Sequence, residues 1–151
     1  MLEKIKKIPS PIVALTLLLI AYVLKFIVPA FDKIIFSSFP LAVTTVAFGS
    51  LVSGWALFLF IKAKTDLNPA GKPSKLVTEG PFNVSRNPMY LGAFIILLGV
   101  AFYMGTLSFY LVPLAYFFIT NYLLIPYEEG KLERIFGDTY LSYKKRARRW
   151  I

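Results

Sequence analysis

Cysteine and histidine are both absent from this chain of 151 residues. Without cysteine, the chain has no disulfide, no thiolate nucleophile and no zinc site built on thiolates. Without histidine, it lacks the commonest general base and the commonest metal ligand in proteins. Proton and charge chemistry is therefore left to aspartate, glutamate, lysine, arginine and tyrosine, and we expect no metal site.

Charged residues are also few, at 17% of the chain, whereas hydrophobic residues make up 57% and aromatic residues 17%. This apolar content is too high for a soluble domain of this size, yet polar residues recur too often for a single membrane anchor. The length allows one domain, covering residues 1–151. The first apolar run lacks a small-residue cleavage site, so we interpret it as a retained helix and not as a signal peptide.

Four apolar segments approach the length of about 20 residues that a helix needs to cross a bilayer. They cover approximately residues 11–30, 41–61, 89–107 and 108–127. Only Gly105, Thr106 and their neighbours are available to connect the last two, which predicts a tight antiparallel hairpin. Because lipid offers the backbone no hydrogen-bond partner, the spans must be helices. The prediction is an all-α integral membrane helical bundle of about four transmembrane helices, followed by a short cytosolic C-terminal helix.

Basic residues are distributed unevenly among the segments that flank these spans. The segments before the first span, between the second and third spans and after the fourth span are rich in basic residues: Lys4, Lys6 and Lys7 in the first, Lys62, Lys64, Lys72, Lys75 and Arg86 in the 62–88 connector, and Lys131, Arg134, Lys144, Lys145, Arg146, Arg148 and Arg149 in the tail after Tyr127. The two other turns are poor in them. The 31–40 turn carries Lys33 beside Asp32, and the Gly105 turn carries no basic residue. Because cytosolic loops are enriched in lysine and arginine, this pattern predicts a multi-pass protein with both termini in the cytosol. We expect it in the cell inner membrane.

The net charge of +9 has two interpretations. Basic residues beside membrane spans set orientation and attract anionic headgroups, which makes membrane lipids the expected partners. Nucleic-acid binding is the rival, but these basic residues flank spans and do not alternate with aromatic residues on a soluble fold. We therefore expect no nucleic-acid partner.

The most informative segment is residues 76–92, which read LVTEGPFNVSRNPMYLG. Two apolar segments later come the paired Glu128 and Glu129, and then Phe136, Gly137, Tyr140 and Tyr143. This order resembles the family of isoprenylcysteine carboxyl methyltransferases and phospholipid N-methyltransferases. The signature of that family is Arg-His-Pro-x-Tyr-x-Gly, then paired glutamates, then FG-x-x-Y-x-x-Y. Residues 86–92 read Arg-Asn-Pro-Met-Tyr-Leu-Gly, so Asn87 stands where the family has histidine.

The resemblance implies a membrane methyltransferase that uses S-adenosylmethionine, releases S-adenosylhomocysteine and acts on a lipid-like methyl acceptor. Residues 76–92 and 128–150 are then the cofactor-binding elements. The expected cofactor-binding residues are Glu79, Gly80, Arg86, Asn87, Pro88, Tyr90, Gly92, Glu128, Glu129, Tyr140 and Tyr143. The expected catalytic residues are Arg86, Tyr90 and Glu128, and the expected substrate-binding residues are Asn121 and Arg148.

The start of the third apolar segment has residue types suited to a charged ligand. The guanidinium fork of Arg86 can hold a carboxylate of the cofactor or of a substrate acid, with a snorkelling, orientation-setting arginine as the alternative. Pro88 fits the first turn of a helix, where free N–H groups favour an anion. Asn87 suits adenine or ribose edges, or caps the helix. Tyr90 lies on the same face as Arg86 and offers a sulfonium a cation–π contact, or it is an interfacial belt tyrosine.

Three glycines have expected roles in this region. Gly80 marks a turn and lets backbone approach a ligand. Gly92 and Gly99 lie seven residues apart on one helical face, where small residues favour close helix contact. For Gly92 that role and ligand contact remain equally open.

The paired acids Glu128 and Glu129 follow Pro126 at the expected end of the fourth span, where the helix dipole disfavours negative charge. This placement indicates a cationic or hydrogen-bonding partner, namely the cofactor's amino group, its ribose hydroxyls or Arg86. Salt bridges to tail lysines are the alternative. Asn121 lies on the face of Glu128 inside the span, where a polar group is functional or bonds between helices.

The tail after Gly130 carries apolar residues at helical spacing, namely Leu132, Ile135 and Phe136. They predict a short amphipathic helix against the membrane. It is either an interfacial anchor or, as the resemblance implies, a flap that folds over the cofactor.

The two possible methyl acceptors differ in whether they must lose a proton before they are methylated. A carboxylate is already ionised and needs no general base, whereas an amine must first lose a proton. The lack of histidine favours a carboxylate, as in isoprenylcysteine methylation. A phospholipid N-methyltransferase is the alternative enzyme, and a non-catalytic helical membrane protein with a binding or scaffold role is the alternative of another class, left open by Asn87.

Overall fold

A computed structural model describes residues 8–65, 71 and 73–151. Its helices are α2 (Ser10–Ile27), α3 (Phe39–Ala63), α4 (Pro88–Met104), α5 (Leu107–Ile119), α6 (Ile125–Phe136) and α7 (Asp138–Arg146), with short turns η1 (Pro29–Asp32) and η2 (Gly80–Asn83) and a π-helical segment η3 (Thr120–Leu124). The described part of the chain is all-α, as predicted. Lys4, Lys6, Lys7 and Lys72 of the charge pattern lie outside the described residues.

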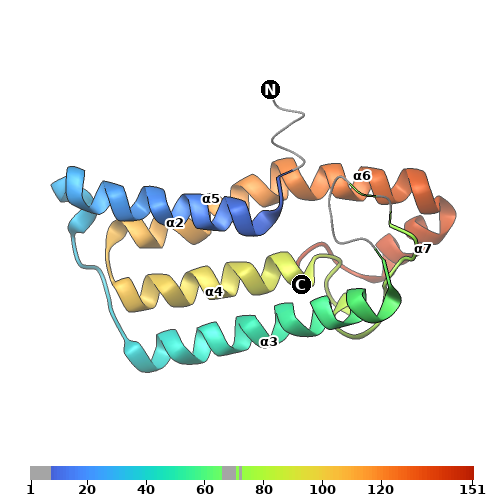
Figure 1. Ribbon diagram of the computed structural model, residues 1–151, viewed down its shortest axis with the longest axis horizontal. Helices are drawn as coiled ribbons and strands as arrows, with labels where there is room; N and C mark the ends of the chain where they lie inside the picture. The colour runs from blue at the N-terminus through green and yellow to red at the C-terminus, as the bar shows by residue number, and fades with distance from the viewer. Residues whose placement is uncertain (1–7, 66–70, 72) are drawn as a thin grey trace.

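Helices α2 to α5 run side by side along the long axis of the molecule (Figure 1). Helix α4 packs against both α3 and α5, and α2 packs against α5. The buried core of this bundle includes Leu97, Ala101, Phe109, Val112 and Tyr116. Helix α6 continues the line of α5 beyond the ends of the other helices, and α7 turns back beneath it (Figure 1). Helices α6 and α7 therefore form one end of the molecule, beside the start of α4.

The α3–α4 contact is made by glycines. A Cβ added to Gly92 would lie 2.6 Å from the Gly49 carbonyl oxygen, and one added to Gly99 would lie 3.0 Å from the Ala42 carbonyl oxygen. Side chains at these positions would therefore force the two helices apart. The predicted close helix contact at Gly92 and Gly99 is confirmed.

The hairpin predicted at Gly105 is also confirmed. Gly105 ends α4 in the left-handed conformation, with φ of 71°, which glycine adopts without steric cost. Its carbonyl accepts a hydrogen bond from Ile35 N at 2.8 Å, and Leu107 N donates to Lys33 O at 3.1 Å. The two connections at this end of the bundle therefore pair with each other.

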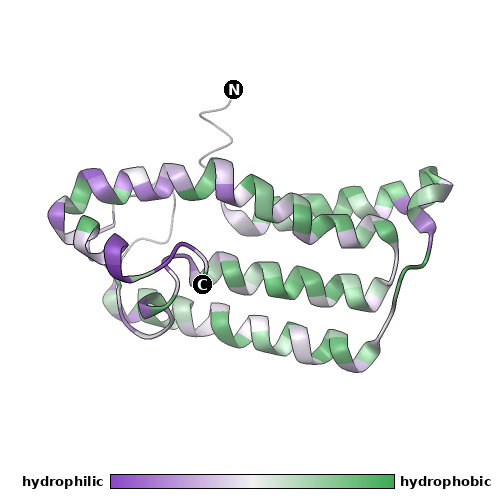
Figure 2. Cartoon of the chain, turned by 180° about the vertical axis from the view of Figure 1, so that it is seen from behind, coloured by the Kyte–Doolittle hydropathy of each residue, from purple (hydrophilic) through white to green (hydrophobic). Residues whose placement is uncertain are grey.

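Three helical stretches are long and apolar enough to cross a membrane, namely Ser10–Ile27, Phe39–Ala63 and Leu107–Phe136, and Pro88–Met104 is a shorter apolar helix of 17 residues. Large hydrophobic side chains face outward on α2 and α3, among them Leu15, Leu19, Phe26, Phe48, Leu51 and Phe58. An apolar exterior of this extent suits lipid and not water. Figure 2 shows hydrophilic residues gathered instead at the end that carries α6 and α7.

The fourth span differs from its predicted range of 108–127, because the helix does not end at the glutamates. It continues for 30 residues, as Leu107–Phe136. Pro126 has no N–H to donate to the carbonyl four residues earlier, and the chain widens into a π turn in which Ile125 N donates to Thr120 O. Glu128 and Glu129 thus lie inside a continuous helix. The expectation that they sit at a helix C-terminus, disfavoured by its dipole, was wrong.

Candidate functional site

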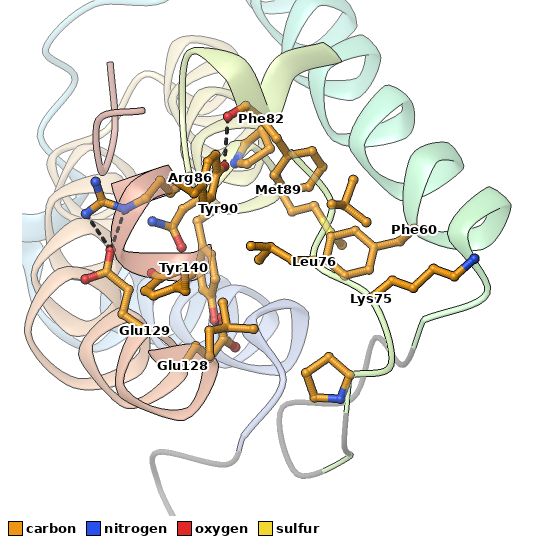
Figure 3. A pocket seen from close by; sticks show the side chains of 16 residues that line it. Phe60, Lys75, Leu76, Phe82, Arg86, Met89, Tyr90, Glu128, Glu129 and Tyr140 are labelled. Atoms are coloured by element: carbon orange, nitrogen blue, oxygen red, sulfur yellow. Dashed lines mark hydrogen bonds and ion pairs between the residues drawn. The ribbon is translucent and has the colours of Figure 1, made fainter. Parts of the chain in front are cut away.

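A pocket opens at the end of the bundle where α4 begins and α6 and α7 lie. It encloses about 640 Å³, its open mouth included. Its polar lining consists of Lys75, Arg86, Asn87, Tyr90, Glu128, Glu129, Tyr140 and Tyr143, and its apolar lining includes Phe60, Leu76, Val77, Phe82, Met89 and Leu132. Figure 3 shows Arg86 paired with Glu129 on one side and Phe60 with Leu76 on the other. The pocket therefore has a charged wall and an apolar wall.

Most of the residues expected to bind the cofactor line this one pocket, although they come from three separate segments. Arg86, Asn87, Pro88 and Tyr90 come from the start of α4, Glu128 and Glu129 from α6, and Tyr140 and Tyr143 from α7. The tail predicted as an anchor or a flap forms α6 and α7, and α7 closes one side of the pocket.

Five expected site residues lie outside the lining of this pocket. Glu79 is exposed and borders a neighbouring groove with Lys62, and Gly80 packs against Trp55 and Leu59. Gly92 faces α3, Arg148 is exposed, and Asn121 bonds to Arg149 and Trp150. The structure gives Gly92 a packing role, because no side chain fits between it and α3.

Arg86 is held from two sides. Its Nε and Nη2 donate to Glu129 Oε1 at 3.1 and 2.8 Å, and its Nη1 donates to the carbonyls of Lys144 and Ala147. Its side chain is 10% exposed and that of Glu129 is 6% exposed, so this is a largely desolvated ion pair. The fork that we expected to clamp a ligand carboxylate is occupied by the protein itself.

Asn87 precedes α4 but does not cap it with its side chain. Its backbone N donates to Ser85 Oγ at 3.1 Å, and its Nδ2 donates to the carbonyl of Arg149 at 3.0 Å. The amide therefore links the start of α4 to the end of the chain. The first turn of α4 instead begins at Pro88, which needs no capping partner because it has no N–H.

Tyr90 and Glu128 form the second polar pair of the pocket. The hydroxyl of Tyr90 donates to Glu128 Oε1 at 2.7 Å, a distance typical of a hydrogen bond to a carboxylate. No arginine pairs with Glu128 within the described residues, in contrast to Glu129. Glu128 is thus a pocket carboxylate whose hydrogen-bond partner is a neutral hydroxyl and not an arginine.

The two tyrosines of α7 are neutral hydroxyls. Burial raises the pKa of Tyr143 to about 12, and its hydroxyl donates to the Phe82 carbonyl at 2.8 Å. Burial also raises the pKa of Tyr140, and the negative charge of Glu129 raises it further. Neither tyrosine serves as a base at neutral pH. The Tyr140 hydroxyl is buried without a hydrogen-bond partner among the described residues, and the nearby Arg86 charge partly offsets the rise in its pKa.

Sequence reasoning missed the roles of Arg149 and Trp150. Arg149 Nη2 donates to Glu129 Oε2 at 2.8 Å, and Trp150 Nε1 donates to Asn121 Oδ1 at 3.0 Å. Both residues belong to a basic tail whose only local signal is membrane orientation. Sequence reasoning also did not predict the apolar wall of the pocket. Phe60 and Met89 lie in apolar segments, where their residue types do not distinguish a pocket-lining position from a lipid-facing one.

Comparisons with known proteins agree with this site. The family model described as phospholipid methyltransferase matches residues 37–139, which include most of the pocket. A protein of Haemophilus influenzae, described as uncharacterized, is 36% identical over 63 residues, covering 42% of this chain and 100% of that protein. No solved structure matches.

Proposed function

Because this chain belongs to the phospholipid methyltransferase family, we propose that it transfers a methyl group from S-adenosylmethionine to a lipid-like acceptor. Family membership indicates methyltransferase activity, and the apolar helices indicate a membrane protein. The observation that carries the proposal is the convergence of the Arg86, Glu128–Glu129 and Tyr140 segments on one pocket at a helix end.

The pocket fits the chemistry of S-adenosylmethionine. Phe60, Leu76, Phe82 and Met89 offer an apolar wall for adenine, and the unpartnered Tyr140 hydroxyl suits a ribose hydroxyl. Glu128 places a carboxyl group in the pocket, where a sulfonium or an ammonium group would require a negative charge nearby. When bound, this cofactor supplies an electrophilic methyl group.

The protein's own residues position the reactants and exclude water. The Arg86–Glu129 pair fixes α4 against α6 and α7, which sets the shape of the pocket. Tyr90 holds the Glu128 carboxylate in one orientation. Positioning of this kind accounts for most of the rate in a transfer that needs little covalent help from the enzyme.

Two features support a lipid amine as the acceptor. The Arg86 fork is engaged by Glu129, so it offers no open clamp for an acceptor carboxylate. Glu128 supplies, in place of histidine, a carboxylate that can take the proton which an amine must lose. The carboxylate acceptor of an isoprenylcysteine-type enzyme remains the second candidate, supported by the lack of histidine, because a carboxylate needs no general base.

The test is calorimetric titration of the detergent-solubilised protein with S-adenosylhomocysteine, followed by turnover assays. Saturable binding and methylation of a phosphatidylethanolamine-like amine are expected, with a rate that rises from about pH 6 to 8 as the ammonium loses its proton. A rate that is flat over this range, on a prenylated cysteine, would replace the amine with the carboxylate. Absence of binding would favour a scaffold role.

A further inference from the structure

Residues 147–150, close to the end of the chain, lie across the segment that leads into α4, and we call them the C-terminal strap. Arg148 forms a parallel β-bridge with that segment, in which Arg86 N donates to Arg148 O at 2.8 Å. Asn87 Nδ2 donates to the next strap carbonyl, that of Arg149, at 3.0 Å. The strap is therefore hydrogen-bonded to two residues that line the pocket, Arg86 and Asn87.

The side chains of the strap contact the long helix formed by α5, η3 and α6. Arg149 Nη2 donates to Glu129 Oε2 at 2.8 Å, and its Nη1 lies 3.5 Å from both oxygens of Asn121. The indole N–H of Trp150 donates to Asn121 Oδ1 at 3.0 Å, and its ring lies 5.1 Å from that of Phe117. Since Asn121 belongs to the π-helical segment, the strap ties the start of α4 to the distorted turn of the long helix.

Glu129 consequently lies between two arginines, with one oxygen bonded to Arg86 and the other to Arg149. The residue is 4% exposed, so an oxygen without a partner would be costly. Without Arg149, the carboxylate would turn toward another donor. The unpartnered Tyr140 hydroxyl lies in the same pocket and is itself buried.

We propose that Arg149 is a positioning residue, which through the C-terminal strap holds Glu129 and Arg86 in the wall of the pocket. Glu128 and the Tyr140 hydroxyl are thereby left to meet the ligand. This inference takes the identity of the ligand, S-adenosylmethionine, from the proposed function. The position of the strap against Glu129 and Asn121 does not depend on it.

The first test is titration with S-adenosylhomocysteine of full-length Arg149→Gln, Arg149→Lys and Lys145→Gln. Lys145 is the control because it lies on α7 just before the strap, carries the same charge, is exposed and has no role in the pocket. We expect Arg149→Gln to bind about 10- to 100-fold more weakly, since Glu129 loses a charged hydrogen bond that holds it in the pocket wall. Arg149→Lys keeps the charge and should bind with intermediate affinity, and Lys145→Gln should match the parent protein. Parent affinity in both Arg149 variants would overturn the proposal.

The second test reads the strap directly through Trp150. The chain has two tryptophans, so Trp55→Phe leaves Trp150 as a single fluorescent reporter. In this background, Arg149→Gln should increase acrylamide quenching of Trp150 and Lys145→Gln should not, with both variants measured well below their unfolding temperatures. If Arg149→Gln does not fold, the same quenching measurement is made on Arg149→Lys. Quenching of Trp150 equal to that in the parent protein would contradict the role of Arg149 in holding the strap.

The two tests separate the strap from the proposed function. If the parent protein does not bind S-adenosylhomocysteine, the proposed function fails, and Trp150 quenching alone decides whether Arg149 seats the strap. If the parent binds and the Arg149 variants bind equally well, the proposed function stands and the positioning role is rejected.

Discussion

Glu128 and Glu129 are adjacent in the chain but meet different partners. Glu129 is buried between Arg86 and Arg149, so its charge is balanced within the protein. Glu128 accepts a hydrogen bond from Tyr90 and lines the pocket without an arginine. Neighbouring residues on a helix point about 100° apart, which lets one acid serve the structure and the other serve a ligand.

Glu128→Gln removes this ligand-facing charge while it keeps the size of the side chain. We expect the affinity for S-adenosylhomocysteine to fall by about 1.5–3 kcal/mol, the value of a hydrogen bond to a charged group. Calorimetric titration measures the change. Glu133→Gln is the control, because Glu133 lies on the same helix, its side chain is 43% exposed and it pairs with Lys144 at 3.4 Å. Equal affinity in the two variants would show that Glu128 does not contact the ligand.

Glu129→Gln should instead lower the stability of the fold. The amide cannot accept from two arginines as a carboxylate does, which leaves Arg86 largely buried with a weakened partner. We expect a loss of about 2–3 kcal/mol in the free energy of unfolding, below the full value for a buried pair because Arg149 is 36% exposed. Denaturant unfolding in detergent provides the measurement, and an unchanged midpoint would mean that the ion pair contributes no net stability.

At the scale of helices, the lengths of the apolar segments predicted that the spans exist, but not that the fourth span continues as a helix to Phe136. Pro126 and the two acids after it suggested a helix end, because proline and charge usually interrupt a span. The π turn at Thr120–Leu124 absorbs the missing N–H, and the helix continues to Phe136. Local sequence does not distinguish these outcomes, since the packing of α7 and the tail against α6 decides between them.

The α3–α4 interface gives a matched pair of glycine substitutions. Gly92→Ala places a methyl group 2.6 Å from the Gly49 carbonyl oxygen, so the helices must separate, at a cost of about 1–3 kcal/mol. Gly54→Ala, on α3, meets no atom within 4 Å and should be neutral or slightly stabilising. Thermal unfolding in the same detergent compares them. Equal midpoints would show that the interface tolerates a methyl group at Gly92.

For the whole molecule, the family resemblance assigned Arg86, Glu128 and Tyr140 to one ligand, and the fold places all three in one pocket. Hydropathy alone yielded the helical bundle, because burial in lipid leaves the backbone no other solution. The engagement of Arg86 and the role of Arg149 could not be predicted in this way. They depend on contacts between residues 20 to 62 positions apart, for which neither periodicity nor a short motif exists.

The charges at the two ends of the molecule predict its orientation in the membrane. The pocket end carries the basic connector and tail, whereas at the other end Lys25 and Asp32 pair at 3.7 Å. We therefore expect the pocket to face the cytosol, where a nucleotide-derived cofactor is available. Because the chain has no cysteine, single cysteines at exposed Ser142 on α7 and exposed Ser37 at the other end report the two sides.

An impermeant maleimide applied to intact cells should label Ser37→Cys at once. It should label Ser142→Cys only after the cells are permeabilised, because that residue lies on the pocket side. Labelling of both variants after permeabilisation controls for accessibility of the thiols. The opposite order would place the pocket outside the cytosol, and a methyltransferase that draws S-adenosylmethionine from the cytosol would then be incompatible with this fold.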